Sequence, residues 1–303
     1  MAYNCVVLIK QVPDTKRITG KAMNDDGTVN RSALPAIFNP EDLNALEMAL
    51  DIKDKFGGKV SVITMGLPAA ASILRESLYR GADDAILITD ARAAASDTLA
   101  TSYILSCAVK QLQYDVVLCG RQAIDGDTAQ VGPQLAEKLN IPQITYVEKF
   151  IELNDRTVTL YRNIGNGWQK VKTTLPVLLT VTSDANEPRV AAAKKMMKFK
   201  TALAPAEIEQ QLKAQNPAAN PDELKALAAH KAVELEKKGN LIKQWNLDFL
   251  KSDLTWCGRS GSPTKVHRIQ SVVLAAKETK SIEPTDAGLT DMIHELIEDK
   301  IIA

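Results

Sequence analysis

The sequence predicts an α/β protein built on a doubly wound, mostly parallel sheet with antiparallel strands added to it. Over the first 150 residues, short apolar runs alternate with helical patterns, and the links between them are short. That alternation is typical of a parallel sheet with helices on both faces. After residue 150 the pattern changes to β-rich segments separated by turn residues, which indicates antiparallel strands.

Continuous apolar runs are typical of strands that are covered on both faces. Five such runs predict strands at residues 4–10, 59–65, 85–89, 116–119 and 144–147. The stretches between them predict helices at residues 40–55, 68–79, 97–113 and 128–139. Asn39 is expected to cap the first helix, which has Pro40 at its first position, and Asp97 is expected at the start of the third.

Ligands of parallel α/β sheets bind beyond the carboxyl ends of the strands, near the point where the strand order reverses. The loops predicted at that edge are residues 10–39, 65–68, 90–97 and 120–128. A functional site is therefore expected in these four loops.

The second half of the chain predicts three kinds of element. The antiparallel strands are predicted at residues 157–162, 168–173 and 177–182, with a hairpin turn in the sequence NIGNG at 163–167. Residues 203–240 are rich in Ala, Glu, Lys and Gln and predict an amphipathic helical excursion, in which Asn220 and Glu223 form a capping box. A short helix is expected at residues 289–299.

Composition excludes several function classes. Lys and Arg number 37 and Asp and Glu also number 37, so the zero net charge argues against a nucleic-acid partner. No apolar run approaches the roughly 20 residues of a transmembrane helix, and the N-terminus does not resemble a signal peptide, so a cytoplasmic location is expected. The four cysteines and three histidines are scattered, so no metal site is predicted, and Cys5 and Cys119 are expected to be buried and reduced.

The most informative motif is GRQAIDGDTAQVGPQ at residues 120–134, between a predicted strand and a predicted helix. A helix N-terminus offers free backbone N–H groups to a phosphate or pyrophosphate, and Gly126 permits close approach. Asp125 and Asp127 are expected to cap backbone N–H groups and so to face away from an anion. A helix cap without any ligand is the alternative interpretation of the same residues.

Other phosphate and catalytic signatures are absent from the sequence. It contains no G-x-G-x-x-G in a first βα turn, no P-loop and no G-x-S-x-G elbow. No histidine lies in a candidate loop, so no catalytic residue is predicted and a cofactor would have to supply any reactive atom.

Several motifs together resemble the β subunit of electron transfer flavoprotein. They are IKQVPDT at residues 9–15, FNPED at 38–42, TMG at 64–66, NEPR at 186–189 and the motif at 120–134. The resemblance covers residues 3–200 and 255–275. It implies a fold like that of the adenine nucleotide α-hydrolases, a bound adenine nucleotide, and a heterodimer with an α subunit whose FAD exchanges electrons with acyl-CoA dehydrogenases. It further implies a nucleotide-binding domain at 1–190, and at 191–303 a partner-recognition loop, the helical excursion and a C-terminal arm that packs on the α subunit.

The resemblance also implies which residues surround the nucleotide. Asp127, Thr128 and Gln130 would hold its pyrophosphate, and Asp97, Thr98 and Thr101 would lie near a flavin or its ribityl chain. The full expected set is Ile9, Asn39, Met65, Gly66, Asp97, Thr98, Thr101, Gly120, Gln122, Ala123, Asp125, Gly126, Asp127, Thr128, Ala129, Gln130 and Val131.

Three features resemble the electron-bifurcating branch of this family: DTLATS at residues 97–102, Gly126 between two aspartates, and GSPTKV at 261–266. That branch implies a FAD in this subunit that accepts a hydride from NADH. One electron would go to a ferredoxin or flavodoxin, and the other through the α-subunit FAD to an acyl-CoA dehydrogenase. The chain would then be an electron-carrier subunit that oxidises NADH only within a complex.

Two alternatives to this function stay open, a conventional subunit with structural AMP and a non-redox nucleotide sensor. An ATP pyrophosphatase would need a Ser-Gly-Gly-x-x-Ser loop, which residues 11–15 lack. Residues 190–200, VAAAKKMMKFK, correspond to the loop with which the family recognises dehydrogenases, although Ala193 stands where a bulkier apolar residue is usual. The alternative interpretation of this segment is a solvated basic strip.

Overall fold

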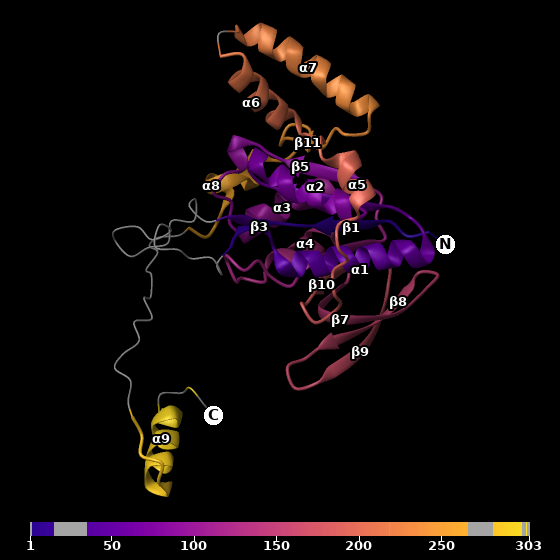
Figure 1. Ribbon diagram of the computed structural model, residues 1–303. Helices are drawn as coiled ribbons and strands as arrows, with labels where there is room; N and C mark the ends of the chain where they lie inside the picture. The colour runs from indigo at the N-terminus through magenta and orange to yellow at the C-terminus, as the bar shows by residue number, and fades with distance from the viewer. Residues whose placement is uncertain (1, 15–34, 218, 266–280, 299–300, 302–303) are drawn as a thin grey trace.

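The computed structural model describes residues 2–14, 35–217, 219–265, 281–298 and 301. Residues 15–34 of the candidate loop at 10–39, and residues 266–275 of the tail that carries the family resemblance, lie outside this description. The predicted α/β class is confirmed. Among the described residues, one sheet of nine strands has the order β11-β5-β4-β1-β6-β10-β7-β8-β9 (Figure 1).

The parallel part of the sheet contains β1 (Cys5–Leu8), β4 (Val60–Met65), β5 (Asp84–Ile88) and β6 (Val116–Gly120), close to their predicted ranges. The assignment of residues 177–182 to the antiparallel group is wrong. They form β10 (Val177–Val181), which pairs in parallel with both β6 and β7. All five residues of β10 are buried, as expected for a strand covered on both faces.

The antiparallel part begins where β7 (Gln143–Asn154) leaves the parallel sheet, since this strand runs well beyond the predicted 144–147. Its second half pairs with β8 (Thr157–Asn163), which pairs in turn with β9 (Trp168–Thr174), so the predicted hairpin is confirmed. Three short strands lack a clear sequence pattern and were not predicted: β2 (Gln11–Pro13), β3 (Ala36–Phe38) and β11 (Lys243–Trp245).

Helices cover both faces of the sheet. The helices α1 (Pro40–Phe56) and α2 (Ala71–Arg80) lie on one face, where Leu46 and Leu74 join the cluster that contains Val7. The helices α3 (Thr98–Val109) and α4 (Val131–Leu139) lie on the other, where Ile104 and Leu135 join the cluster that contains Leu8. Adjacent residues of one strand thus pack into different hydrophobic clusters, because successive side chains of a strand point to opposite faces of the sheet.

The helical excursion is confirmed, but as two helices, α6 (Pro205–Gln215) and α7 (Pro221–Lys237). The predicted cap at Asn220 is present, because its Oδ1 accepts a hydrogen bond of 2.8 Å from the Glu223 amide. Figure 1 shows this helical hairpin beyond the β11 edge of the sheet and the strands β7 to β9 at the opposite edge. The remaining elements are the short turns η3 (Pro68–Ala70), η4 (Ala91–Ala93) and η5 (Leu254–Trp256) and the helices α5 (Ala193–Phe199), α8 (Gly258–Gly261) and α9 (Asp286–Glu298).

The strand order reverses beside β1, which pairs with β4 on one side and with β6 on the other. The chain moves outward from β1 to β4 and β5, then crosses back to β6. The loops that follow β1 and β6 therefore meet at the topological switch point, where ligands of such sheets bind. None of the helices in the described ranges is long and apolar enough to cross a membrane.

Candidate functional site

The start of α1 anchors the loop that follows β6. Asn39 stands at the N-cap position, but its side chain makes no capping bond, so the predicted capping role is wrong. Its fully buried amide instead donates to the Gln122 carbonyl at 2.9 Å and accepts from the Ile124 amide at 3.1 Å. Asn39 therefore fixes the first turn of the candidate loop from within the protein.

Two carboxylates of the same helix complete this anchor. Glu41 accepts from the Gln122 amide at 3.1 Å and forms an ion pair of 3.0 Å with Arg121. Asp42 accepts from the Lys10 amide at 2.8 Å and from the Gly120 amide at 2.9 Å, so it joins the ends of β1 and β6. Burial raises the pKa of Asp42 to about 7, although these hydrogen bonds favour the charged form.

The contact with Asp42 explains the glycine at position 120. A Cβ added there would lie 2.5 Å from Asp42 Oδ1 and 2.9 Å from the Asp42 amide nitrogen. Only a residue without a side chain permits this approach. Gly120 thus serves the anchor, and its amide is already bound to Asp42.

The two aspartates of the motif have side-chain partners. Asp125 forms an ion pair with Lys10 at 2.7 Å, and Asp127 accepts from the Gln122 side-chain amide at 3.0 Å. Capping of backbone N–H groups was the expected role, and for Asp127 the described residues contain no such bond. The Lys10 ammonium lowers the negative charge that Asp125 would present to an anion.

The second half of the loop after β6, from residue 127 onward, contains residues with a left-handed backbone conformation. Asp127 and Ala129 have left-handed φ angles of 48° and 52°, and Gln130 then returns to a right-handed conformation. The helix α4 consequently starts at Val131 and not at the predicted Thr128. Backbone that alternates between the two hands forms a nest, a concavity in which successive N–H groups converge on an anion.

The amides of this nest have no partner within the described part of the chain. Those of Thr128, Ala129, Gln130, Val131 and Gly132 donate no hydrogen bond to another described residue. Beside them, a Cβ added to Gly126 would meet no atom within 4 Å, so the space next to Gly126 is open. Backbone amides without a partner at a helix N-terminus can bind an anion.

The start of α3 lies against this nest. Asp97 caps α3 by accepting from the Ala100 amide at 2.9 Å, which confirms the predicted helix start. Thr98 donates its hydroxyl to Gln130 Oε1 at 2.8 Å and accepts from the Gln134 side-chain amide at 3.3 Å. Thr101 follows one turn later and is half-buried.

The remaining predicted residues lie nearby in the same loops or at strand ends. Ala123 accepts the amides of Gly126 and Asp127 and so closes the turn between the two halves of the loop. Ile9 is buried at the end of β1, and its amide donates to the Ile63 carbonyl. Met65 and Gly66 lie at the carboxyl end of β4, and within the described part of the chain no hydrogen bond joins them to the nest.

Sequence reasoning did not assign a role to several residues of this site. Lys10, Glu41 and Asp42 belong to the motifs that carry the family resemblance, but the carboxylates inside FNPED were not assigned to the loop. Gln134 lies within the long motif and was not named either. The sequence did hold one signal for them, because Glu41 and Asp42 are charged residues in the first turn of a helix that starts beside the switch point.

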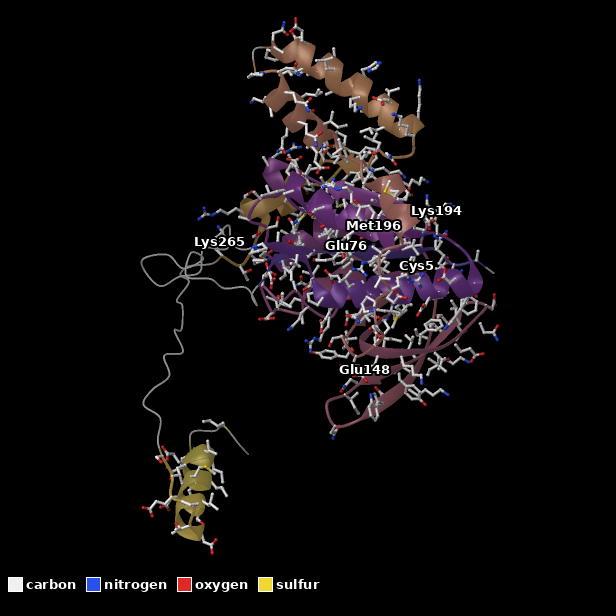
Figure 2. The ribbon with its side chains drawn as sticks, in the orientation of Figure 1. Cys5, Glu76, Glu148, Lys194, Met196 and Lys265 are labelled. Atoms are coloured by element: carbon white, nitrogen blue, oxygen red, sulfur yellow. The ribbon has the colours of Figure 1, made fainter. Side chains whose placement is uncertain are left out.

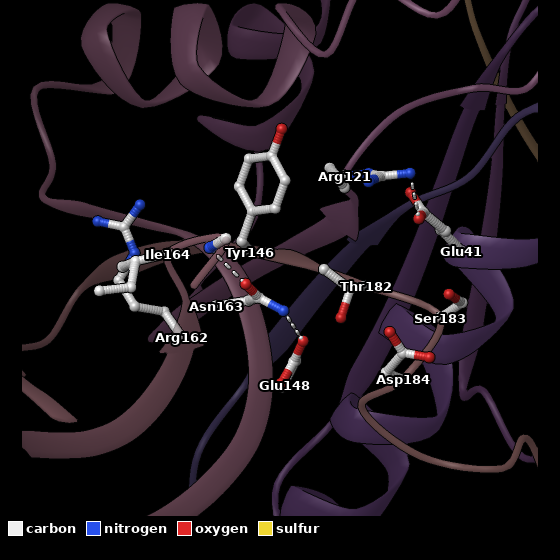
Figure 3. Close-up of a pocket in the computed structure, with 11 residues that line it drawn as sticks. Glu41, Arg121, Tyr146, Glu148, Arg162, Asn163, Ile164, Thr182, Ser183 and Asp184 are labelled. Carbon is white, nitrogen blue, oxygen red and sulfur yellow. Dashed lines mark hydrogen bonds and ion pairs between the residues drawn. The ribbon is translucent and has the colours of Figure 1, made fainter. Parts of the chain in front are cut away.

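A cavity of about 490 Å³ adjoins the anchor on the side of the antiparallel strands (Figure 3). It contains the Arg121–Glu41 ion pair, and the Arg121 guanidinium lies 5.6 Å from the centre of the Tyr146 ring. Asn163 donates to Glu148 at 2.6 Å on its far wall. The lining residues are Glu41, Arg121, Tyr146, Glu148, Arg162, Asn163, Ile164, Gly165, Thr182, Ser183 and Asp184.

A metal site needs a cluster of ligands, and a reactive thiol needs a lowered pKa. The described residues contain no cluster of His, Cys, Asp or Glu that could hold a metal ion. Cys5 and Cys119 are buried free thiols, as predicted, and burial raises the pKa of Cys5 to about 12 and that of Cys119 as well. Both are therefore uncharged core residues.

Comparison with known proteins identifies the family. Residues 26–208 match the family described as "Electron transfer flavoprotein domain". The electron transfer flavoprotein subunit beta of Clostridium acetobutylicum is 36% identical over 299 residues, which cover 99% of this chain and 100% of that protein. The acryloyl-CoA reductase electron transfer subunit gamma of Anaerotignum propionicum is 48% identical over 188 residues, 60% of this chain and 69% of its own length. The caffeyl-CoA reductase-Etf complex subunit CarD of Acetobacterium woodii is 46% identical over 186 residues, 61% of this chain and 70% of its own length. The chain belongs to the electron transfer flavoprotein family, among its β subunits.

Proposed function

We propose that this chain binds FAD at the loop after β6, with the pyrophosphate on the nest of residues 128–132. One observation carries the proposal: the five backbone N–H groups of residues 128–132 donate no hydrogen bond to a described residue. They lie at the switch point of the sheet, in a segment where Asp127 and Ala129 are left-handed. The paired charge of Asp125 and the open space at Gly126 support the fit of an anionic ligand there.

The chain's own residues would bind and orient this cofactor and supply no nucleophile. The anchor formed by Asn39, Glu41 and Asp42 would hold the loop rigid, and Thr98 would fix Gln130 at the rim of the nest. Bound there, FAD would accept a hydride from NADH and pass its electrons on singly. Ferredoxin or flavodoxin would take one of the two electrons and the α-subunit FAD the other, so the subunit would serve electron bifurcation.

We propose further that the chain works as a heterodimer with an α subunit whose FAD serves an acyl-CoA dehydrogenase. The names of two relatives support this assignment, since one is an electron transfer subunit of acryloyl-CoA reductase and the other belongs to a caffeyl-CoA reductase–Etf complex. In this proposal residues 1–190 carry the nucleotide, and residues 191–303 provide partner contacts and the C-terminal arm. A cytoplasmic location accompanies it.

The helix α5 is the proposed contact with the dehydrogenase. It has no buried residue, and Val190 just before it and Met197 within it are 85% and 66% exposed. Figure 2 shows Lys194 and Met196 on the surface of the body. Apolar and cationic side chains on one short helix suit a partner surface, and the solvated basic strip is the alternative.

The test is to co-express the chain with its α subunit, denature the pure complex and quantify the released nucleotides by chromatography. About two FAD per heterodimer support the proposal, and NADH-driven reduction of ferredoxin is then the functional assay. One FAD with one AMP would instead indicate a conventional carrier with structural AMP. One FAD and no AMP per heterodimer, the content of the α subunit alone, would overturn the proposed site.

A further inference from the structure

A segment near the C-terminus packs against the start of α3. This strap, residues 253–265, contains η5 and α8. Gly258 in it has a φ of +62°, and a Cβ added there would lie 2.1 Å from the Arg92 carbonyl oxygen. The Gly258 amide donates to Ser96 Oγ at 3.1 Å. The strap thus touches the loop between β5 and α3 through its own backbone.

The closest polar contact joins the strap to Asp97. Oδ2 of Asp97 accepts from both the amide and the hydroxyl of Thr264, at 3.0 and 2.6 Å. The amide of Asp97 donates to Ser262 Oγ at 2.8 Å, and this hydroxyl, which is buried, donates onward to the Gly258 carbonyl at 2.7 Å. Ser262 and Thr264 therefore bind both the backbone and the side chain of the residue that caps α3.

These contacts occupy the carboxylate of Asp97. Oδ1 accepts the Ala100 amide and Oδ2 accepts Thr264, so both oxygens are bound within the chain. Burial alone would raise the pKa of Asp97. The hydrogen bonds from Ala100 and Thr264 together have a larger effect in the opposite direction, so the pKa of Asp97 lies below its usual value. Asp97 is a charged residue that holds two segments together and does not offer a free oxygen to a ligand.

The strap is connected to the nest through the next residue. Thr98, at the first position of α3, donates to Gln130, whose backbone belongs to the nest. Gln134 of α4 donates to the same hydroxyl. The hydrogen bonds thus run from Thr264 to Asp97, along one peptide to Thr98, and on to Gln130.

We infer that Ser262 and Thr264 are positioning residues for the adenine-nucleotide site, because through Asp97 they fix the start of α3 and the Thr98–Gln130 contact that sets the rim of the nest. This inference rests on the proposed function. The strap lies beyond residue 208, where the match to the electron transfer flavoprotein domain ends. The proposed nucleotide-binding domain would then depend on a segment far from it in sequence.

The test compares variants of Thr264 in the complete heterodimer. Thr264→Val keeps the shape of the side chain and removes its hydroxyl, whereas Thr264→Ser keeps the hydroxyl. Thr255→Val is the matched control, because its hydroxyl donates to Asp253 at 2.7 Å within the strap and forms no hydrogen bond to a described residue of α3. The two readouts are the dissociation rate of the adenine nucleotide and the thermal unfolding midpoint.

We expect Thr264→Val to release the nucleotide about 10-fold faster, since a hydrogen bond to a charged group is lost. Thr264→Ser and Thr255→Val should release it at the wild-type rate, and Ser262→Ala should act in the same direction as Thr264→Val. The inference is overturned if the Thr264→Val complex releases the nucleotide at the wild-type rate. It is also overturned if the Thr264→Ser complex releases the nucleotide as fast as a Thr264→Val complex with accelerated release. A wild-type complex without adenine nucleotide in this subunit overturns the proposed function and the inference with it.

Discussion

The two halves of the loop after β6 differ in what their backbone amides do. In the first half, the amides of Gly120, Gln122 and Ile124 all donate to side chains at the start of α1. In the second half, the amides from Thr128 to Gly132 donate to no described residue. One continuous motif thus contains two parts. In the first, the backbone N–H groups are bonded within the protein, and in the second they are available to a ligand. Substitutions in the first half should therefore change stability, and those in the second half should change binding.

The largest effect is expected from Gly120→Ala. The new methyl group would lie 2.5 Å from Asp42 Oδ1 and would separate the carboxylate from the amide it binds. Overpacking of a close contact together with the loss of a buried hydrogen bond should lower the free energy of unfolding by about 3 kcal/mol. Urea denaturation measures this change, and a loss below about 0.5 kcal/mol would show that the anchor yields easily.

Asn39→Ala should come next. It leaves the Gln122 carbonyl and the Ile124 amide, both partly buried, without their partner, which should cost about 2 kcal/mol. Asn216→Ala is the control, since the Asn216 side chain is exposed and donates only to the Leu212 carbonyl of its own helix. If the two variants denature at the same urea concentration, the loop does not depend on Asn39.

The pH dependence of stability should reveal Asp42. Because burial raises its pKa to about 7 in the folded protein, the native chain binds this proton more tightly than the unfolded chain, whose pKa is about 3.9. The contribution of Asp42 to stability is therefore present at low pH and falls by about 2 kcal/mol between about pH 5 and pH 7. Asp42→Asn removes this titration, so the difference between the two unfolding free energies should change with pH. Parallel curves would contradict the assignment.

The smallest effect on stability belongs to Gly126→Ala. Its φ is not left-handed and an added Cβ meets nothing within 4 Å, so the unfolding free energy should change by less than about 0.5 kcal/mol. If a nucleotide passes close to this backbone, its affinity should nevertheless fall by about 10-fold, measured by titration of the nucleotide-free complex. Unchanged affinity would place the ligand away from Gly126.

Much of the fold could be predicted because the signal was local. The buried parallel strands β1, β4, β5 and β6 are short apolar runs, and their order along the chain already implied a doubly wound sheet. The strand β11 could not be found this way, since its three residues, Lys243 to Trp245, are no more apolar than a loop. The strand β10 was found but misassigned, because an apolar run does not say which neighbours it pairs with.

The candidate site was predictable in position but not in detail. Asp127 and Thr128 look like helix-capping residues, yet the left-handed backbone of Asp127 and Ala129 delays α4 to Val131. The contact between Asp97 and Thr264 joins residues 167 positions apart, and no local pattern encodes such a pair. Hydrogen-bonding side chains satisfy local rules equally well whether their partner is near or distant in sequence.

The helical hairpin α6–α7 enters and leaves the body at one point. Leu203 and Leu241 form a parallel bridge, with the Leu203 amide bound to the Asn240 carbonyl and the Ile242 amide bound to the Leu203 carbonyl. Because the bridge closes the chain beneath the hairpin, the exposed residues of α7 can differ in length or sequence with little effect on the sheet, whereas Glu207 of α6 is held to the body by its ion pair with Arg75. The outer helix of the hairpin therefore suits the attachment of a label, and exposed His230 on α7 offers a position for one outside the sheet.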